Sequence, residues 1–333
     1  MKILLVLKRF ISWCKGIKNL PEFMKHSNEF HEFIDSLPEF SQFIKMSRDY
    51  PYWDSCLKGI ASGWFPVFIK YPVNPQSRYG YGLEPHFRLY SILNKERKSY
   101  EELMHVFMQF KQYFLAINVN ETSDFHVPFW SNPWFTGLDA ISLYAFITIK
   151  KPKTYLEIGS GNSTKFARQA INDHLLETKI VSIDPFPRTE IDSISDFVIR
   201  KPLEEIDLSV FNILEPGDIL FFDGSHRCFM NSDVTVFFLE VLPMIPSGVL
   251  IHIHDIHLPL DYPPARKFHW ESEQYLLATM LLANDIKYRT ILPNKFVMTD
   301  EELLNIIHPL LTSLDVADDI HGFSFWMEKT IVD

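Results

Sequence analysis

The hydrophobic pattern divides the chain into two stretches. From residue 126 onward, short apolar runs of strand length alternate with longer stretches that have helical spacing. Residues 1–125 show mainly helical spacing. Alternating strands and helices with short connections are typical of a parallel sheet that carries helices on both faces. We therefore predict a mainly helical N-terminal region over residues 1–125 and an α/β domain over residues 126–333.

The elements of the α/β domain can be placed by residue number. Strands are predicted at 154–159, 179–184, 196–201, 218–223, 248–255, 288–293 and 323–328. Helices are predicted at 136–149, 163–174, 203–211, 229–243, 271–284 and 300–313. Together these elements predict a seven-stranded, mostly parallel sheet. Ligands of such open sheets bind beyond the carboxyl ends of the strands, so we expect the functional residues to gather there.

Two helices are expected in the N-terminal region. Residues 99–116 predict one helix with an apolar face made of Leu103, Val106, Phe107, Phe110 and Phe114. Residues 2–18 place basic side chains among large apolar ones, which fits a basic amphipathic helix on a membrane surface or a helix docked on its own protein. No run approaches the roughly 20 apolar residues of a spanning helix. We expect a cytoplasmic protein, with membrane contact through residues 2–18 as an alternative.

Composition and charge narrow the function. Of the 333 residues, 47% are hydrophobic, which is enough for a sizeable core. The formal net charge of −10 argues against a general nucleic-acid-binding protein, because phosphate contacts need a basic surface. The three cysteines show neither paired nor metal-type spacing, which suits a reducing compartment.

The first predicted strand ends in a glycine turn, within the run Tyr155-Leu-Glu-Ile-Gly-Ser-Gly-Asn-Ser-Thr164. Glycines let the backbone turn tightly and approach a ligand, and the helix that follows directs free N–H groups at it. The third glycine of the dinucleotide fingerprint is missing, because residue 164 is Thr. The carboxylate of Glu157 would repel a pyrophosphate but suits a cationic ligand. S-adenosylmethionine has an ammonium and a sulfonium group, so we predict it as the cofactor. The predicted contacts here are Glu157, Gly159, Ser160, Gly161, Asn162 and Ser163.

Other polar residues follow the later strands. Asp184, followed by Pro185, ends the second strand and is well placed for ribose hydroxyls. Asp223 ends the fourth strand, and His226 follows it. His254 and Asp255 end the fifth strand. These side chains are expected to converge, because the two strands are expected to be neighbours.

Three interpretations of this convergence remain open. In the first, Asp223, Asp255 and His254 hold a divalent metal such as magnesium, which would lower the pKa of an acceptor hydroxyl. In the second, His226 or His254 removes the acceptor proton without a metal. In the third, these side chains cap loops and helices.

Residues 132–328 resemble the class I S-adenosylmethionine-dependent methyltransferases, which have a Rossmann-like sheet. Glu157-Ile-Gly-Ser-Gly resembles their first motif, Asp184 their ribose-binding acid, and Asp223 and the segment 248–255 their fourth and fifth strands. Within the class, the chain is similar to a bacterial branch of macrocin-type and catechol-type O-methyltransferases. The metal-dependent members carry an acidic pair after the fifth strand, where this chain has His254-Asp255. The lysine base of the catechol-type enzymes corresponds to His226.

The resemblance implies methyl transfer to an oxygen of a small molecule or glycan, with Asp223 at the methionine end of the cofactor. Asp223, His226, His254 and Asp255 are then the catalytic candidates. Two alternatives are an NAD(P)-dependent oxidoreductase on the same kind of sheet and a non-catalytic relative that acts as a binding protein. The sequence indicates neither the acceptor nor the oligomeric state.

Overall fold

The computed structural model describes residues 74–187, 190–267, 269–283, 287–316 and 322–330. The predicted amphipathic helix at residues 2–18 lies outside the described residues, as does the rest of the chain before residue 74. Residues Ser77–Asp333 form one compact unit, so the helices of residues 77–125 belong to the same unit as the sheet. None of the described helices is long and apolar enough to cross a membrane.

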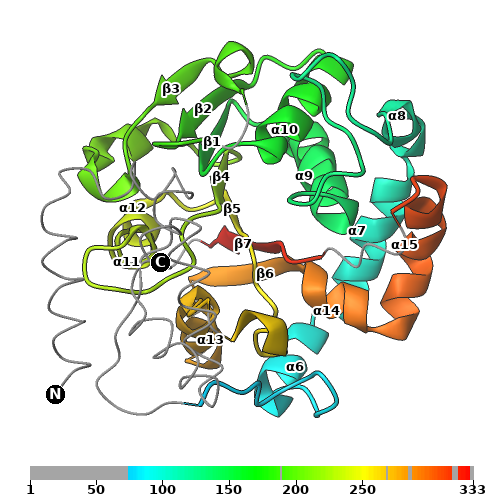
Figure 1. Cartoon of the computed structure of the whole chain (residues 1–333), viewed down its shortest axis with the longest axis vertical. Helices are drawn as coiled ribbons and strands as arrows, with labels where there is room; N and C mark the ends of the chain where they lie inside the picture. The colour runs from blue at the N-terminus through cyan, green and yellow to red at the C-terminus, as the bar shows by residue number, and fades with distance from the viewer. Residues whose placement is uncertain (1–73, 188–189, 268, 284–286, 317–321, 331–333) are drawn as a thin grey trace, which may run out of the picture. The chain divides into compact units, whose positions relative to one another are not determined.

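A seven-stranded sheet crosses the unit in the order β3-β2-β1-β4-β5-β7-β6 (Figure 1). The strands are β1 (Thr154–Ile158), β2 (Lys179–Ile183), β3 (Phe197–Ile199), β4 (Ile219–Phe222), β5 (Leu250–Ile253), β6 (Tyr288–Pro293) and β7 (Phe325–Lys329). Strands β1–β5 pair in parallel, and β7 runs antiparallel to both of its neighbours. The predicted seven-stranded, mostly parallel sheet is confirmed. Strands β1, β4 and β5 are buried along their whole length, as expected for the centre of a sheet covered on both faces.

Helices follow the strands as the alternating pattern predicts. The α-helices after the first strand are α10 (Asn162–Asp173), α11 (Asp233–Val236), α12 (Leu242–Met244), α13 (Glu273–Leu282), α14 (Asn294–Thr299) and α15 (Glu301–Ser313). Helix α9 (Gly137–Lys150) precedes β1 and lies beside α10 (Figure 1). The helices before it are α6 (Phe87–Asn94), α7 (Arg97–Met108) and α8 (Lys111–Ala116), and α7 packs against α15.

The single helix predicted at residues 99–116 is wrong, because the structure has two helices there. The N–H groups of Gln109 and Phe110 donate three residues back, to Val106 and Phe107, and this tightened turn ends α7. The chain changes direction at Phe110. The buried face therefore differs from the predicted one, and its members are Tyr100, Met104, Phe107 and Phe114.

Two other helix predictions need correction. The segment predicted as a helix at 203–211 forms two 3-10 turns, η3 (Leu203–Glu205) and η4 (Leu208–Ile213), separated by the extended Asp207 that caps the second turn. The helix predicted at 229–243 begins only at Asp233, because the hydroxyl of Ser232 accepts a hydrogen bond from the N–H of Thr235 and caps it. A π-helical turn, η5 (Phe237–Val241), joins α11 to α12. The remaining 3-10 turns of the described residues are η2 (Asp192–Ile194) and η6 (Pro264–Arg266).

A buried carboxylate fixes α9 to the reversed strand. Asp139 is 1% exposed and accepts hydrogen bonds from the Asn294 side chain at 2.8 Å and from the N–H groups of Phe323 and Ser324 at 2.9 and 2.8 Å. Burial of an unpaired carboxylate would be costly, and these three donors compensate it. Asp139 therefore holds the beginning of β7 at the same edge of the sheet as the carboxyl ends of β5 and β6.

Candidate functional site

The register of the central strands brings their carboxyl ends to one edge. Ile158, the last residue of β1, pairs with Ile183 of β2 on one side and with Phe222 of β4 on the other. Phe222 in turn pairs with Ile253 of β5. The residues that directly follow these paired positions are Asp184, Gly159, Asp223 and His254. The predicted site residues therefore emerge side by side from four neighbouring strands.

Gly159 sits where the turn after β1 meets the turn after β4. Its φ is +80°, a left-handed conformation that favours glycine. A Cβ atom at this position would lie 1.9 Å from the carbonyl oxygen of Asp223. The Asp223 N–H donates to the carbonyl of Ile158 at 2.8 Å, which holds the two turns together. A residue with a side chain is excluded at position 159 for both steric and conformational reasons.

Glu157 is fully buried beneath this turn and is held by hydroxyl groups. Its Oε1 accepts hydrogen bonds from Thr164 at 2.6 Å and from Ser182 at 2.5 Å, and its Oε2 accepts from Tyr155 at 3.1 Å and from Ser163 at 3.4 Å. Burial raises the pKa of Glu157 to about 7, although the four hydroxyl donors act in the opposite direction. We call these five side chains the hydroxyl cluster.

Thr164 stands where the dinucleotide fingerprint has its third glycine, and its side chain has a structural role there. Its hydroxyl accepts a hydrogen bond from the N–H of Gly161 at 3.0 Å while donating to Glu157. It thereby closes the first turn of α10 and links that turn to β1. The N–H groups at the beginning of α10 remain available to a ligand, as expected for the first turn of a helix.

Asp184 lies at the end of β2 and borders the same turn. One carboxylate oxygen accepts from the Ser160 N–H at 2.8 Å and from the Ser160 hydroxyl at 3.2 Å, and the other accepts from the Phe186 N–H at 2.8 Å. Its side chain is partly exposed, as is that of Pro185, whereas Phe186 is 88% exposed. Asp184 therefore shapes the turn and keeps a carboxylate at the surface of the edge.

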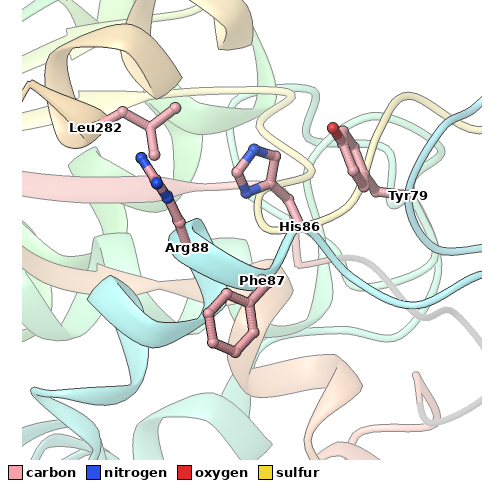
Figure 2. A pocket seen from close by; sticks show the side chains of 5 residues that line it. All are labelled: Tyr79, His86, Phe87, Arg88 and Leu282. Carbon is pink, nitrogen blue, oxygen red and sulfur yellow. The ribbon is translucent and has the colours of Figure 1, made fainter.

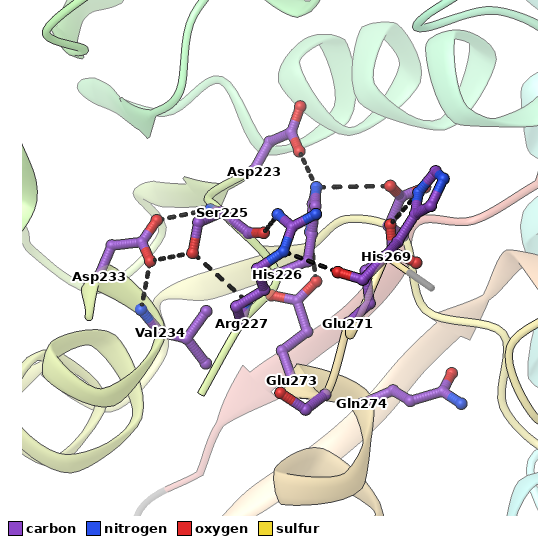
Figure 3. Close-up of polar contacts among 12 residues, drawn as sticks. Asp223, Ser225, His226, Arg227, Asp233, Val234, His269, Glu271, Glu273 and Gln274 are labelled. Atoms are coloured by element: carbon purple, nitrogen blue, oxygen red, sulfur yellow. Dashed lines mark hydrogen bonds and ion pairs between the residues drawn. The ribbon is translucent and has the colours of Figure 1, made fainter. Parts of the chain in front are cut away.

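The acids after β4 and β5 converge on one imidazole, and Figure 3 shows Asp223 and Glu273 beside this ring of His226. The Nε2 atom of His226 lies 3.3 Å from Asp223 Oδ1 and 3.4 Å from Asp255 Oδ2. On the other side of the ring, Nδ1 lies 2.5 Å from Oε1 of Glu273, which is fully buried in the first turn of α13. Arg266 contacts Asp255 at 2.9 Å and Glu271 at 3.2 Å. We call these six residues the charged cluster.

The charges of this cluster shift one another. Burial alone would lower the pKa of His226, but Glu273, Asp255 and Asp223 raise it to about 10, so the ring is an imidazolium at neutral pH. Burial alone would raise the pKa of Asp255, yet His226, His254 and Arg266 hold it well below its usual value. The charged cluster is thus a network of ion pairs, whereas the hydroxyl cluster contains no cation.

The three histidines of the fifth strand end have different surroundings. His252 is fully buried, stacks on Phe221 at 3.9 Å and contacts the hydroxyl of Ser324 at 2.8 Å, and burial lowers its pKa well below the usual value. His257 is also buried, and burial lowers its pKa to about 3. His254 directly precedes Asp255 in the sequence. Its buried Nδ1 atom has no hydrogen-bond partner among the described residues.

The metal interpretation does not fit this arrangement. Within the described part of the chain, no group of three His, Cys, Asp or Glu side chains could hold a metal ion. Asp223 and Asp255 face the imidazolium of His226 instead, and Asp255 also pairs with Arg266. These ion pairs leave out His254, the third of the predicted metal ligands. We therefore derive no chemistry through a metal at these residues.

A surface pocket lies apart from the strand ends. Its volume is about 480 Å³, and it is lined by Tyr79, His86, Phe87, Arg88 and Leu282 (Figure 2). None of these residues belongs to the hydroxyl cluster or the charged cluster.

Comparison with known proteins identifies the central part of the chain. Residues 156–256, from β1 to the loop after β5, match the model of a family described as a methyltransferase domain. This segment is therefore similar to a methyltransferase domain. The seven-stranded sheet, which extends beyond the matched segment to β6 and β7, has the Rossmann-like architecture that the resemblance to class I enzymes implied. The matched segment contains Glu157, Asp184, Asp223, His226 and Asp255.

The other proteins that this chain resembles are distant. An uncharacterised protein of Archaeoglobus fulgidus is 33% identical over 98 residues, so the match spans 27% of this chain and less than half, 43%, of that protein. A methyltransferase of Podospora anserina solved with bound SAH shares 12% identity over 68% of this chain and 88% of that one, at a TM-score of 0.38. The plantazolicin methyltransferase BpumL, solved with SAH, shares 15% identity over 72% of this chain and 90% of that one, also at a TM-score of 0.38. An O-methyltransferase of Bacillus cereus, solved with SAH, shares 15% identity over 58% of this chain and 82% of that one, at a TM-score of 0.32. These structural likenesses are too distant to bear on function.

Sequence reasoning did not find Glu273 or Arg266. Both lie after the fifth strand, in a stretch whose apolar spacing predicts only a helix at 271–284. A glutamate in the first turn of a helix is the usual complement to the helix dipole. Nothing in the local sequence marks Glu273 as a partner of a histidine 47 residues earlier.

Proposed function

We propose that this protein transfers a methyl group from S-adenosylmethionine to a hydroxyl oxygen of a small molecule or glycan. The observation that carries the proposal is the register of β2, β1 and β4. It brings Asp184, the glycine turn at Gly159 and the carboxylate of Asp223 to one edge in that order. An acid for ribose hydroxyls, a close backbone approach and an acid for the methionine end are what an adenosyl cofactor needs there.

The chain's own residues fit this cofactor. Asp184 offers a partly exposed carboxylate to the ribose, and the first turn of α10 offers N–H groups. Glu157 is enclosed by hydroxyls, so its part is to hold the turn of Gly159 and Gly161 in shape and to place a buried carboxylate beneath it. A cationic ligand above that turn gains from such a carboxylate. When bound, S-adenosylmethionine supplies a methyl group carried on a sulfonium.

The acceptor must lose its hydroxyl proton, and the two histidines after β4 and β5 have different roles in this step. His226 already holds protons on both ring nitrogens at neutral pH, so it acts as a cation that stabilises a forming oxyanion. Asp255 is a weak base because its pKa is held low. His254 is then the remaining base candidate, since it directly precedes Asp255 at the end of β5.

Calorimetry of the purified full chain tests the cofactor. We expect S-adenosylmethionine and S-adenosylhomocysteine to bind and NAD⁺ not to bind. Asp184→Ala should weaken cofactor binding by at least about tenfold, because a charged hydrogen-bond acceptor for the ribose is lost. Glu177→Ala is the matched control, since Glu177 is exposed just before β2 at the opposite edge of the sheet. No heat at millimolar S-adenosylmethionine, or tighter binding of NAD⁺, would refute the proposal.

A further inference from the structure

His226 occupies a position that two acids share. Its Nε2 atom lies 3.3 Å from Asp223 and 3.4 Å from Asp255, and these acids come from the ends of two neighbouring strands. In the sequence resemblance, the same two acids are the residues that would bind a divalent metal. The structure places a side-chain nitrogen between them. A ring nitrogen at these distances from two carboxylates forms an ion pair with each when the ring is charged, and it occupies the position where the two acids would share a metal.

The backbone around His226 is built to hold the ring there. Its φ is +63°, a left-handed conformation that is uncommon for a residue with a side chain. The carbonyl of His226 accepts a hydrogen bond from the Ser272 N–H at 2.8 Å, and the Ser272 hydroxyl accepts from the Cys228 N–H at 2.9 Å. The beginning of α13 thus clamps the loop on both sides of the ring. Such strain persists only where the surrounding contacts enforce it.

Glu273 fixes the orientation of the ring. Its side chain is fully buried, and Oε1 lies 2.5 Å from His226 Nδ1. A carboxylate at Nδ1 holds the proton on that nitrogen, so the second N–H is directed away from α13, toward the two acids. Glu273 is a positioning residue, because it affects Asp223 and Asp255 only through its contact with His226.

Arg266 supplies a second positive charge to one of the two acids, Asp255. Its Nη1 lies 2.9 Å from Asp255 Oδ2 and 3.2 Å from Glu271 Oε2. The Asp255 carboxylate therefore faces an imidazole on one side and a guanidinium on the other. A divalent ion would have to approach these two cations and displace at least one of them, which is unfavourable at such short distances.

We propose that the side chain of His226, anchored by Glu273, takes the place of a divalent metal between Asp223 and Asp255. It excludes divalent ions from that position and presents a ring nitrogen to both acids. The use of the charged ring to stabilise an acceptor oxyanion rests on the proposed function, whereas the exclusion of metal does not.

Binding of Mn²⁺ to the full chain tests the proposal without an acceptor or a cofactor. Electron paramagnetic resonance or calorimetry should show no Mn²⁺ bound between Asp223 and Asp255 in the wild-type protein. His226→Ala should gain Mn²⁺ binding, at least about tenfold tighter than the wild type, because a cation is removed from between two acids. The gain should disappear in the double variant His226→Ala/Asp223→Asn. His308→Ala, which alters an exposed histidine on α15, is the control and should behave as the wild type.

Circular dichroism shows whether His226→Ala folds. If it does not fold, Glu273→Gln is the second variant that tests the proposal. The amide still accepts from Nδ1 but removes the anchoring charge, so Mn²⁺ should bind more tightly than to the wild type and less tightly than to His226→Ala. Mn²⁺ binding by the wild type that Asp223→Asn abolishes would overturn the proposal. So would the absence of any gain in folded His226→Ala. Cofactor calorimetry on the same samples tests the proposed function separately, because it needs no metal.

Discussion

The two halves of the candidate site stabilise buried carboxylates in different ways. Glu157, below the glycine turn, is surrounded by four hydroxyls and has no cationic partner in the hydroxyl cluster. Glu273 and Asp255, on the other side of Asp223, are paired with His226 and Arg266. A buried carboxylate held only by neutral donors is costly to ionise, so a cationic ligand that approaches it favours its charged form. One held by cations has its charge cancelled within the protein. The hydroxyl cluster thus suits a positive ligand, whereas the charged cluster already contains positive charges.

The largest effect is expected from a change in the backbone that joins the hydroxyl cluster to the charged cluster. In Gly159→Ala the new Cβ would meet the Asp223 carbonyl oxygen at 1.9 Å, and φ is +80°. We expect the free energy of unfolding to fall by more than about 4 kcal/mol, or the protein not to fold, because neither backbone segment can move freely. Chemical denaturation followed by circular dichroism measures this.

Gly217→Ala separates the steric effect from the conformational one. Gly217 also has a positive φ, +96°, but beyond its chain neighbours no heavy atom of the described residues lies within 4 Å of the position that a Cβ would take. We expect a loss of only about 1 kcal/mol, from the left-handed conformation alone. Equal losses in the two alanine variants would contradict the close approach of the two turns.

The next largest effect is expected in the hydroxyl cluster. Glu157→Ala removes the shared acceptor of four hydroxyls and leaves a small cavity, so we expect the free energy of unfolding to fall by about 3 kcal/mol at pH 6. Thermal or urea unfolding measures it. Ser195→Ala is the comparison, since the Ser195 hydroxyl contacts Ser182 at 3.0 Å without touching Glu157. A loss as small as that of Ser195→Ala would show that the carboxylate is not central to the cluster.

The raised pKa of Glu157 also predicts that the free energy of unfolding depends on pH. Its pKa is 4.5 in the unfolded chain and about 7 in the folded protein, so the folded state holds the proton more tightly. The contribution of Glu157 is therefore most favourable below pH 4.5 and declines as the pH rises to about 7, by about 3 kcal/mol in total. The difference in unfolding free energy between the wild type and Glu157→Gln, measured from pH 4.5 to 7.5, should follow this decline. A flat difference would place the carboxylate in contact with water.

The charged cluster should show the opposite sign. The pKa of Asp255 is held well below its usual value, so the stability from its ion pairs is fully present above the usual carboxyl pKa and declines as the pH falls from there toward the lowered pKa of the folded state. Arg266→Met should cost about 1–2 kcal/mol at pH 7, a modest amount because Arg266 is partly exposed, and the cost should become smaller only as the pH falls to about 2. Arg289→Met, at an exposed ion pair with Glu328, should cost no more than about 0.5 kcal/mol. A cost for Arg266→Met that does not change with pH would contradict the ion pair.

Sequence reasoning located the strands and the residues at their ends because both depend on local pattern. Runs such as Ile219–Phe222 are apolar and end at an abrupt aspartate, and the parallel sheet then brings such ends together. The contacts within the site could not be predicted in the same way. The tightened turn at Phe110 has no glycine or proline to mark it. The partnership of His226 with Glu273 depends on how α13 packs after a long loop, and only the folded structure decides that.

The close backbone contact between Gly159 and Asp223 also has a thermodynamic consequence. The turn at Gly159 and Asp223, which belongs to the charged cluster, share a backbone contact without room for a methyl group. A ligand that displaces one of them must therefore displace the other. If the cofactor shifts this contact, it changes the affinity for the acceptor, and the acceptor must change the affinity for the cofactor by the same factor. One glycine then makes the two binding events energetically coupled.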